Sequence, residues 1–236
     1  MLAFRIIKDT FIKFYDKLFQ LVILNLVLIT VIALPLYLLY LLNNVVVLAL
    51  SLVYIVLFIG PMILSALNYI NDTLDYTKDV KIKDFFRGIK ENYKRGEIAF
   101  LFTVIIYAIL LIDLFFFWTR AEGFLMSFVA IIFLYLVICF TFMQVYFWGL
   151  LSLQKEKSIK LIIKNSFLMA IDNIFSTFFI LVFVFIFTLL CLVLPVMVPF
   201  FIFSTIILLV LIATDYTLEK YRHKENNDSK GKEDNQ

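Results

Sequence analysis

Charged side chains are scarce in this chain of 236 residues. Asp, Glu, Lys and Arg make up 17% of the residues, whereas 64% are hydrophobic and Phe alone occurs 28 times. A soluble domain has about a quarter charged and about half apolar residues, so this chain lacks the polar surface that a water-exposed globule needs. The composition therefore excludes a soluble enzyme, a disordered chain and a secreted disulfide scaffold.

Histidine and cysteine are also nearly absent. The one histidine, His223, lies in the polar tail, and Cys139 and Cys191 lie in apolar runs, where cysteine packs as a small hydrophobe. Zinc sites need clusters of His, Cys and carboxylate ligands, and the sequence has no phosphate-binding glycine loop. It also lacks paired acids and a nucleophile with its base inside the apolar runs. The sequence therefore predicts no cofactor, no metal site and no enzymatic activity.

Long apolar runs are what the chain does contain, and they match a lipid core of about 30 Å. The runs predict six spans, at 21–42, 45–67, 98–118, 124–151, 174–194 and 196–214. The last two are separated because one helix over 174–214 would be about 60 Å long, and Pro195 and Pro199 interrupt it. Asn43 and Asn44 mark the turn between the first two spans. The predicted fold class is an all-α membrane protein, a six-helix transmembrane bundle with amphipathic cytoplasmic surface helices.

The cations give this topology an orientation. With six spans, 20 of the 21 Lys and Arg residues lie on one side of the membrane, and only Arg120 lies on the other. Basic residues mark the cytoplasmic side, so both termini are predicted to be cytoplasmic. The polar tail, 215–236, then lies in the cytoplasm.

The N-terminal segment, 1–20, is predicted to be an amphipathic interfacial helix. Apolar residues recur at three- and four-residue steps, at Phe4, Ile7, Phe11, Phe14 or Tyr15, and Leu18, and cations lie between them. Such a helix lies flat in the head-group region with its apolar face in the lipid. The alternative is that the first span simply continues into water.

A second amphipathic segment, 78–95, carries the candidate contact residues. Its cations recur at steps of four, three and four residues, at Lys83, Arg87, Lys90 and Lys94. Anionic lipid attracts such a stripe by about 1 kcal/mol per residue near the surface. An acidic patch on a partner protein is a second possible contact, and positive charge that only fixes the topology is a third interpretation. Nucleic acid is not expected as a partner, because the apolar face of this segment partitions better into lipid.

A third surface segment, 155–173, resembles the second. Residues 159–164 (IKLIIK) align with 82–87 (IKDFFR) at an offset of 77 residues, and each block lies between two spans. The alignment indicates a repeated unit of span, surface helix and span. The alternative is two surface helices that only look alike.

Inside the spans, an ionisable side chain is a functional candidate by default, and only Asp113 qualifies. It is the candidate intramembrane polar site. It lies near the outer end of its span, close to Arg120, so pairing with Arg120 or with outside water is favoured over a proton or cation relay. Asn25 and Gln144 are predicted to hydrogen-bond between helices. Gly60-Pro61 predicts a bend or break in the second span.

Several of these pieces resemble the YesL-like (DUF624) family of bacterial multi-pass membrane proteins. The resemblance is strongest over 60–67 (GPMILSAL) followed by 83–94 (KDFFRGIKENYK), and it extends to 24–26 with 34–35 and to 158–170. The family has no established reaction, and its members are associated with carbohydrate uptake systems.

The resemblance implies a non-enzymatic accessory component near a carbohydrate uptake system in the bacterial cell membrane. Its expected partners are the lipid bilayer, anionic lipid head groups and transporter subunits. The alternative function is a small solute transporter or channel, with a hydrated path that reaches Asp113 or the break at Gly60-Pro61.

Overall fold

The computed structural model describes residues 2–42, 44–120, 123–154 and 158–233, and nearly all of them are helical. The helices are α1 (Leu2–Asp16), α2 (Leu18–Leu42), α3 (Val45–Leu74), α4 (Ile82–Glu91), α5 (Tyr93–Thr119), α6 (Phe124–Leu153), α7 (Ile159–Asp172), α8 (Ile174–Val193) and α9 (Val198–Glu233), with a 3-10 turn, η1 (Pro195–Met197), before α9. The described residues contain no strand. The predicted all-α fold class is therefore confirmed.

Among the described residues, five helices are long and apolar enough to cross a membrane. They are α3, α5, α6, α8 and the segment Pro195–Arg222, which is η1 with most of α9. A sixth span is obtained if α1 and the first part of α2, which meet at 93°, count as one bent unit. The chain is thus a multi-pass membrane protein.

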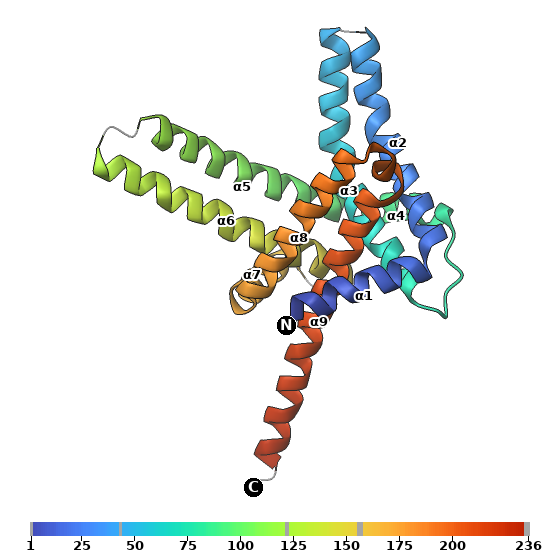
Figure 1. Cartoon of the computed structure of the whole chain (residues 1–236), viewed down its shortest axis with the longest axis vertical. Coiled ribbons are helices and arrows are strands. Elements are labelled where there is room, and N and C mark those ends of the chain that lie inside the picture. The colour runs from blue at the N-terminus through green and yellow to red at the C-terminus, as the bar shows by residue number, and fades with distance from the viewer. Residues whose placement is uncertain (1, 43, 121–122, 155–157, 234–236) are drawn as a thin grey trace.

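Three helical hairpins, formed by α2 with α3, α5 with α6 and α8 with α9, share one base (Figure 1). The α2/α3 and α5/α6 hairpins project from this base in different directions, and α1 and the end of α9 lie at the same end of the molecule. Helix α9 packs against α1, α2, α3, α6 and α8, so it is the central element. The core lies in the shared base and is built from 62–70 of α3, 143–151 of α6 and 208–213 of α9.

The outer halves of the hairpins are apolar and exposed. Ile112 and Phe115 of α5 are 67% and 70% exposed, and Phe124 of α6 is 87% exposed. Water would not tolerate an apolar surface of this extent, whereas lipid covers it without cost and requires only that the backbone be hydrogen-bonded within the helices.

Small residues allow the helices to approach closely in the base. A Cβ atom on Gly96 of α5 would lie 2.7 Å from the Cα of Pro61 in α3, and one on Gly60 would lie 2.5 Å from the Cβ of Phe100. Gly149 of α6 likewise lies against Thr214 of α9. Membrane helices pack through such small residues because van der Waals contact replaces the hydrophobic driving force.

Of the interruptions predicted at prolines, the one at Pro195 is present, because α8 ends at Val193 and η1 separates it from α9, whereas no break occurs at Gly60-Pro61. Helix α3 continues without a break through Gly60-Pro61, and α2 continues through Pro35. Proline has no N–H to offer the carbonyl four residues earlier, which in α2 is the carbonyl of Val31. The Tyr54 hydroxyl of α3 donates to that carbonyl oxygen at 3.3 Å. A neighbouring helix therefore supplies the hydrogen bond that Pro35 removes.

Helix α1 packs on the protein through one face and leaves Phe4 and Phe11 of the predicted lipid-facing surface exposed. Its buried residues are Ala3, Ile6, Thr10 and Phe14, whereas Phe4 and Phe11 are 64% and 47% exposed. The rings of Phe4 and Phe11 lie beside Phe179 and Phe183 of α8, at centroid distances of 6.4 and 5.8 Å. The small side chains of Ala3 and Thr10 bring α1 close to α9, which the apolar pattern alone does not reveal.

The two surface helices α4 and α7 begin at the aligned positions Ile82 and Ile159. The residue that follows each helix is an asparagine, Asn92 after α4 and Asn173 after α7. The same asparagine directly precedes the next long helix, α5 or α8. In both, the side-chain amide donates to the carbonyl four residues earlier, at 2.8 Å to Gly88 and 3.0 Å to Met169. The two surface helices therefore begin and end alike, while the larger repeat of span, surface helix and span stays a prediction.

Replacing Gly96 by valine will destabilise the chain, because the new side chain meets the backbone of Pro61. Overpacking of this kind costs about 1–3 kcal/mol. The loss of unfolding free energy is measured by unfolding the protein with sodium dodecyl sulfate in mixed micelles. The control is Ala108→Val on the exposed side of α5, which will change stability little. Equal losses in both variants would show that the α3/α5 crossing is not a tight contact.

Candidate functional site

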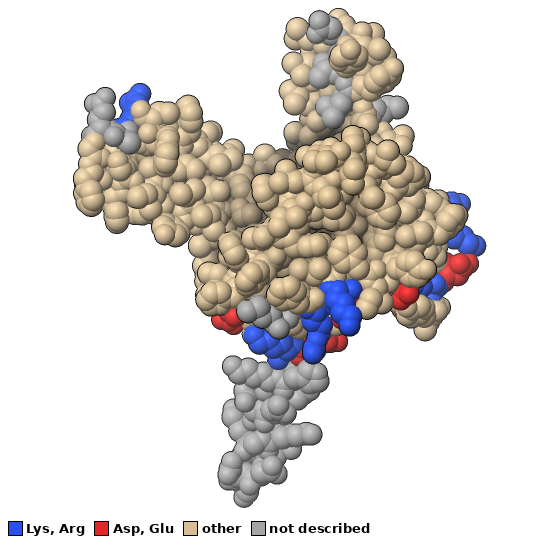
Figure 2. Space-filling model, viewed as in Figure 1, with Lys and Arg blue, Asp and Glu red and all other residues tan. Residues whose placement is uncertain are grey.

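Charged residues gather at one end of the molecule (Figure 2). We call this the charged end and define it as residues 2–17, residues 72–97, α7 and residues 215–222 of α9. Among described side chains, only Asp113 and Arg120 carry charge elsewhere. The cationic stripe predicted from the sequence lies at this end, on α4 and the first turn of α5.

Helix α4 is held firmly on α3. Phe85 is completely buried, and the hydroxyl of Ser65 in α3 donates to the carbonyl of Phe85 at 2.5 Å. Gly88 lies over the same Ser65, so close that a Cβ atom there would be 2.5 Å from the serine oxygen. At the start of α4, the carboxylate of Asp84 accepts a hydrogen bond of 2.9 Å from the backbone N–H of Lys81. These contacts fix the face that α4 presents.

The four predicted contact residues divide into two groups. Arg87 is paired within α4, at 2.9 Å to Asp84 and 3.4 Å to Glu91. Lys83, Lys90 and Lys94 are exposed, and no described residue forms an ion pair or hydrogen bond with any of their ammonium groups. The three lysines are thus the part of the stripe that is open to a ligand.

Lys90 lies at an apolar groove of about 410 Å³ between α2, α3 and α4. Val31, Phe58 and Met62 line its apolar part, and Lys90 and Tyr93 lie on the α4/α5 side. An apolar groove beside a cation has the chemistry of a site for an amphiphile with an anionic group.

Asp113 is half-buried on α5, and the structure does not pair it with Arg120. The Arg120 guanidinium instead lies over the Phe116 ring at 4.6 Å, and no described cation is within ion-pair distance of Asp113. The predicted pairing with Arg120 is therefore wrong, because Arg120 follows the last turn of α5 and turns back onto its own helix. Pairing of Asp113 with outside water stays a prediction.

Asn25 and Gln144 form the predicted hydrogen bonds between helices. The Asn25 carbonyl oxygen accepts from the backbone N–H groups of Phe203 and Ser204 at 2.8 and 3.0 Å. Its amide donates to the carbonyl of Val198 at 3.0 Å. A completely buried side chain of α2 thus binds the first turns of α9. Between α5 and α6, Thr103 donates to Gln144 at 3.2 Å.

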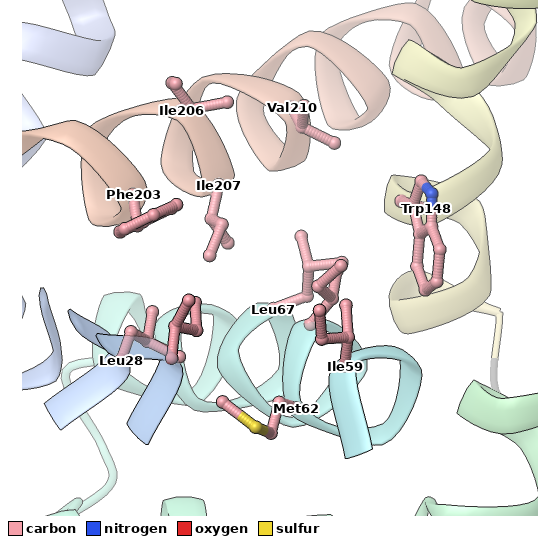
Figure 3. A pocket seen from close by; sticks show the side chains of 11 residues that line it. Leu28, Ile59, Met62, Leu67, Trp148, Phe203, Ile206, Ile207 and Val210 are labelled. Carbon is pink, nitrogen blue, oxygen red and sulfur yellow. The ribbon is translucent and has the colours of Figure 1, made fainter. Parts of the chain in front are cut away.

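An apolar chamber of about 440 Å³ lies between α2, α3, α6 and α9 (Figure 3). Each of the four helices contributes lining residues, among them Leu28 of α2, Met62 of α3, Trp148 of α6 and Ile207 of α9. Every lining side chain is apolar or aromatic. No pattern in the sequence predicts this chamber. The apolar periodicity of four helices shows which residues avoid water, but it does not show where the helices diverge enough to leave a space.

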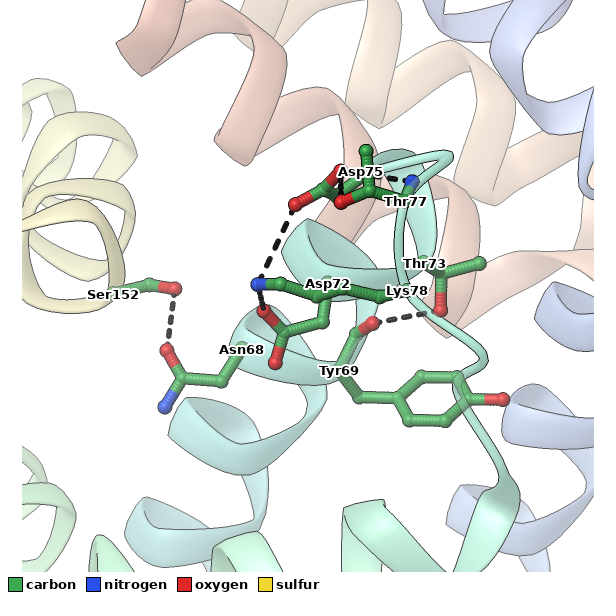
Figure 4. A network of polar contacts seen from close by, with 8 residues as sticks. All are labelled: Asn68, Tyr69, Asp72, Thr73, Asp75, Thr77, Lys78 and Ser152. Atoms are coloured by element: carbon green, nitrogen blue, oxygen red, sulfur yellow. Dashed lines mark hydrogen bonds and ion pairs between the residues drawn. The ribbon is translucent and has the colours of Figure 1, made fainter.

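A polar network lies at the C-terminal end of α3 and in the loop that follows it, at the charged end of the molecule (Figure 4). Lys78 binds Asp72 at 2.5 Å and Asp75 at 3.6 Å. The hydroxyl and the backbone N–H of Thr77 donate to Asp75 at 2.7 and 3.1 Å, and they hold the pKa of the Asp75 carboxyl below its usual 3.8. Asp72 in turn raises the pKa of Lys78 above 10.5, by hydrogen bonding and by its charge. The network closes the loop between α3 and α4.

Asn25→Leu will weaken the α2/α9 contact, because the backbone groups of α9 lose their partner. The expected loss is about 1–2 kcal/mol, measured by unfolding in mixed micelles. Thr30→Val is the matched control on α2, since the Thr30 hydroxyl binds only the carbonyl of Leu26 in its own helix. A loss in the control as large as in Asn25→Leu would contradict the assigned role.

Asp75→Asn will loosen the loop before α4, and trypsin will cleave after Lys78 and Lys81 faster at pH 8. A carboxyl with a lowered pKa stabilises the fold above its usual pKa and loses this effect only as the pH falls through the lowered value, so the wild-type loop stays protected throughout the neutral range. Asp16→Asn is the control, because Asp16 is exposed and forms no ion pair with any described residue. Unchanged cleavage in Asp75→Asn would refute the role of the network.

Comparison with known proteins adds no relative. No protein-family model, no curated protein and no solved structure matches the chain. The resemblance to the YesL-like family therefore stays a prediction that rests on the quoted motifs.

Proposed function

We propose that this chain is a non-enzymatic accessory protein of a membrane transport system, attached to its partner through the cationic face of α4. The observation that supports this most directly is a set of three exposed lysines, Lys83 and Lys90 on α4 and Lys94 on the first turn of α5. The opposite side of α4 is anchored by Phe85 and Gly88. A fixed helix that presents unpaired cations is suited to bind an acidic surface, because little backbone freedom is lost on contact.

The assignment to a carbohydrate uptake system follows from the family resemblance alone. The resemblance also gives the bacterial cell membrane as the location. The gathering of charge at one end supports an orientation in which this end, and with it both termini, faces the cytoplasm.

Anionic lipid head groups are a second candidate ligand for the same face. The groove beside Lys90 favours them, because an acyl chain can lie along Phe58 and Met62 while the phosphate reaches Lys90. Each lysine near an anionic surface contributes about 1 kcal/mol.

The alternative of a small solute transporter or channel needs a hydrated path at Asp113 or Gly60-Pro61. The observed surroundings favour the accessory function over this alternative. Pro61 lies in the tight α3/α5 crossing, and the polar side chains between α5 and α6 bind one another, Thr103 to Gln144 and Tyr107 to Thr141.

Replacing Lys83, Lys90 and Lys94 together by glutamine will abolish most of the binding. Three lost contacts of about 1 kcal/mol each correspond to roughly 100-fold weaker binding. The measurements are recovery of transporter subunits from gently solubilised native membranes, and flotation of the purified protein with vesicles that contain anionic lipid. The control is Lys8→Gln with Lys160→Gln and Lys164→Gln, which removes the same charge elsewhere at the charged end.

The two measurements separate the candidate ligands. Loss of the transporter subunits in the α4 variant, but not in the control, supports the accessory function. Loss of vesicle binding alone identifies anionic lipid as the ligand. Equal behaviour of wild type, α4 variant and control in both measurements overturns the role of α4.

A further inference from the structure

We propose that the apolar chamber holds one acyl chain of a phospholipid whose head group combines a phosphate with a primary ammonium. The head group lies in the polar pocket that follows the chamber toward the charged end, lined by Lys13, Asn71, Asp75 and Asp215. This lipid site is distinct from the face of α4, so it goes beyond the proposed function and the two fail independently.

The chamber has the chemistry of a hydrocarbon site. Its volume of about 440 Å³ lies in the range of small-molecule pockets, about 300–1,000 Å³. A packed interior leaves few voids larger than a water molecule. Water is a poor occupant, because a buried water needs two to four polar partners and no side chain that lines the chamber is a charged, amide or hydroxyl group. In a bilayer, the abundant apolar occupant is an acyl chain.

The chamber and the polar pocket are neighbours along α3. Ile63 and Leu67 line the chamber, and Asn71 lines the pocket one turn further on, together with Asp75, which directly follows the helix. Residues four apart are neighbours on a helix surface. The apolar lining at Leu67 is therefore followed within one turn by the polar lining at Asn71.

Helix α9 repeats the arrangement from the opposite side. Phe203 and Ile207 line the chamber, and Leu211 and Asp215 continue at four-residue steps into the pocket. Figure 3 shows the side chains of α9 and α3 on opposite sides of the space, with Trp148 of α6 at one end. Both helices thus change from apolar to polar at the same level, as a lipid does at its ester linkage.

The length of the chamber matches one leaflet. From Ile59 to Leu67, α3 rises about 12 Å, and one leaflet of hydrocarbon is about 15 Å thick. The chamber ends at Ile59, where α3 approaches the tight crossing at Gly60. The site therefore accepts a chain that enters from the charged end and does not cross the whole membrane.

The charges of the pocket select the head group. Lys13 is a cation beside the carboxylates of Asp75 and Asp215, and among described residues no ion pair joins Lys13 to either acid. A phosphate fits Lys13, and a primary ammonium donates hydrogen bonds to Asp215. A head group with only negative charge would meet the two carboxylates, and a quaternary ammonium has no N–H to donate.

Fluorescence of Trp148 tests the proposal directly. Trp118→Phe leaves Trp148 as the single tryptophan, because the chain has only two. Phospholipids with brominated acyl chains are added to the detergent-solubilised protein, with ethanolamine, choline or glycerol head groups in three parallel titrations. We expect saturable quenching by the ethanolamine lipid and at least tenfold weaker binding of the other two.

Variants that fill the chamber or alter the pocket complete the test. Ile63→Phe and Ile207→Phe place a larger side chain in the chamber and will reduce binding at least tenfold, whereas Ile112→Phe on the exposed side of α5 will not. Asp215→Asn will remove the preference for ethanolamine. Lys13→Gln, on α1, will weaken the binding of every phospholipid without filling the chamber.

Three results would overturn the proposal. They are quenching that does not saturate, quenching that is equal in the chamber-filling variants and in Ile112→Phe, and equal affinity for the three head groups. Native mass spectrometry of the washed protein gives an independent readout if a variant is unstable. Wild type that retains no ethanolamine phospholipid also contradicts the proposed site.

Discussion

The structure depends on a solvent that offers no hydrogen bonds. In lipid, each backbone group that a proline or a helix end releases must find a partner inside the protein. Helix α2 takes part in two such sets of hydrogen bonds. The Tyr54 hydroxyl of α3 donates to the Val31 carbonyl of α2, and the Asn25 side chain of α2 hydrogen-bonds to backbone groups in the first turns of α9. These bonds bind α2 to both of its neighbours, so the polar groups that the membrane penalises become the contacts that fix the arrangement of the hairpins.

Close packing is confined to the base of the molecule. The tight approaches of Gly60 to Gly96, of Gly88 to Ser65 and of Gly149 to Thr214 all lie there, whereas the outer halves of the hairpins carry large exposed side chains. The hairpins therefore diverge from a firmly joined base (Figure 1). A space between helices is the geometric consequence of divergence, and the chamber between α3 and α9 is such a space.

The sequence predicts the helices well because length, apolar runs and charge each limit the possibilities. Asn25 and Gln144 were also predictable as contacts between helices, since a buried amide in lipid requires a partner. The packing face of α1, the orientation of Arg120 and the chamber were not predictable. Each depends on where a neighbouring helix lies, and the apolar faces of membrane helices carry little information about direction, because lipid and protein interior are equally apolar.

Differences between the aligned residues of α4 and α7 explain why we assign the contact surface to α4 and not to α7. At the offset of 77 residues, the completely buried Phe85 corresponds to the completely buried Ile162, so both surface helices are anchored in the same way. Lys83 and Arg87 correspond to Lys160 and Lys164, but Lys90 and Lys94 correspond to Phe167 and Ile171. Both of these apolar side chains are about half exposed. Helix α7 therefore keeps the anchor and half of the cations, and only α4 with the first turn of α5 combines a fixed orientation with a full cationic stripe.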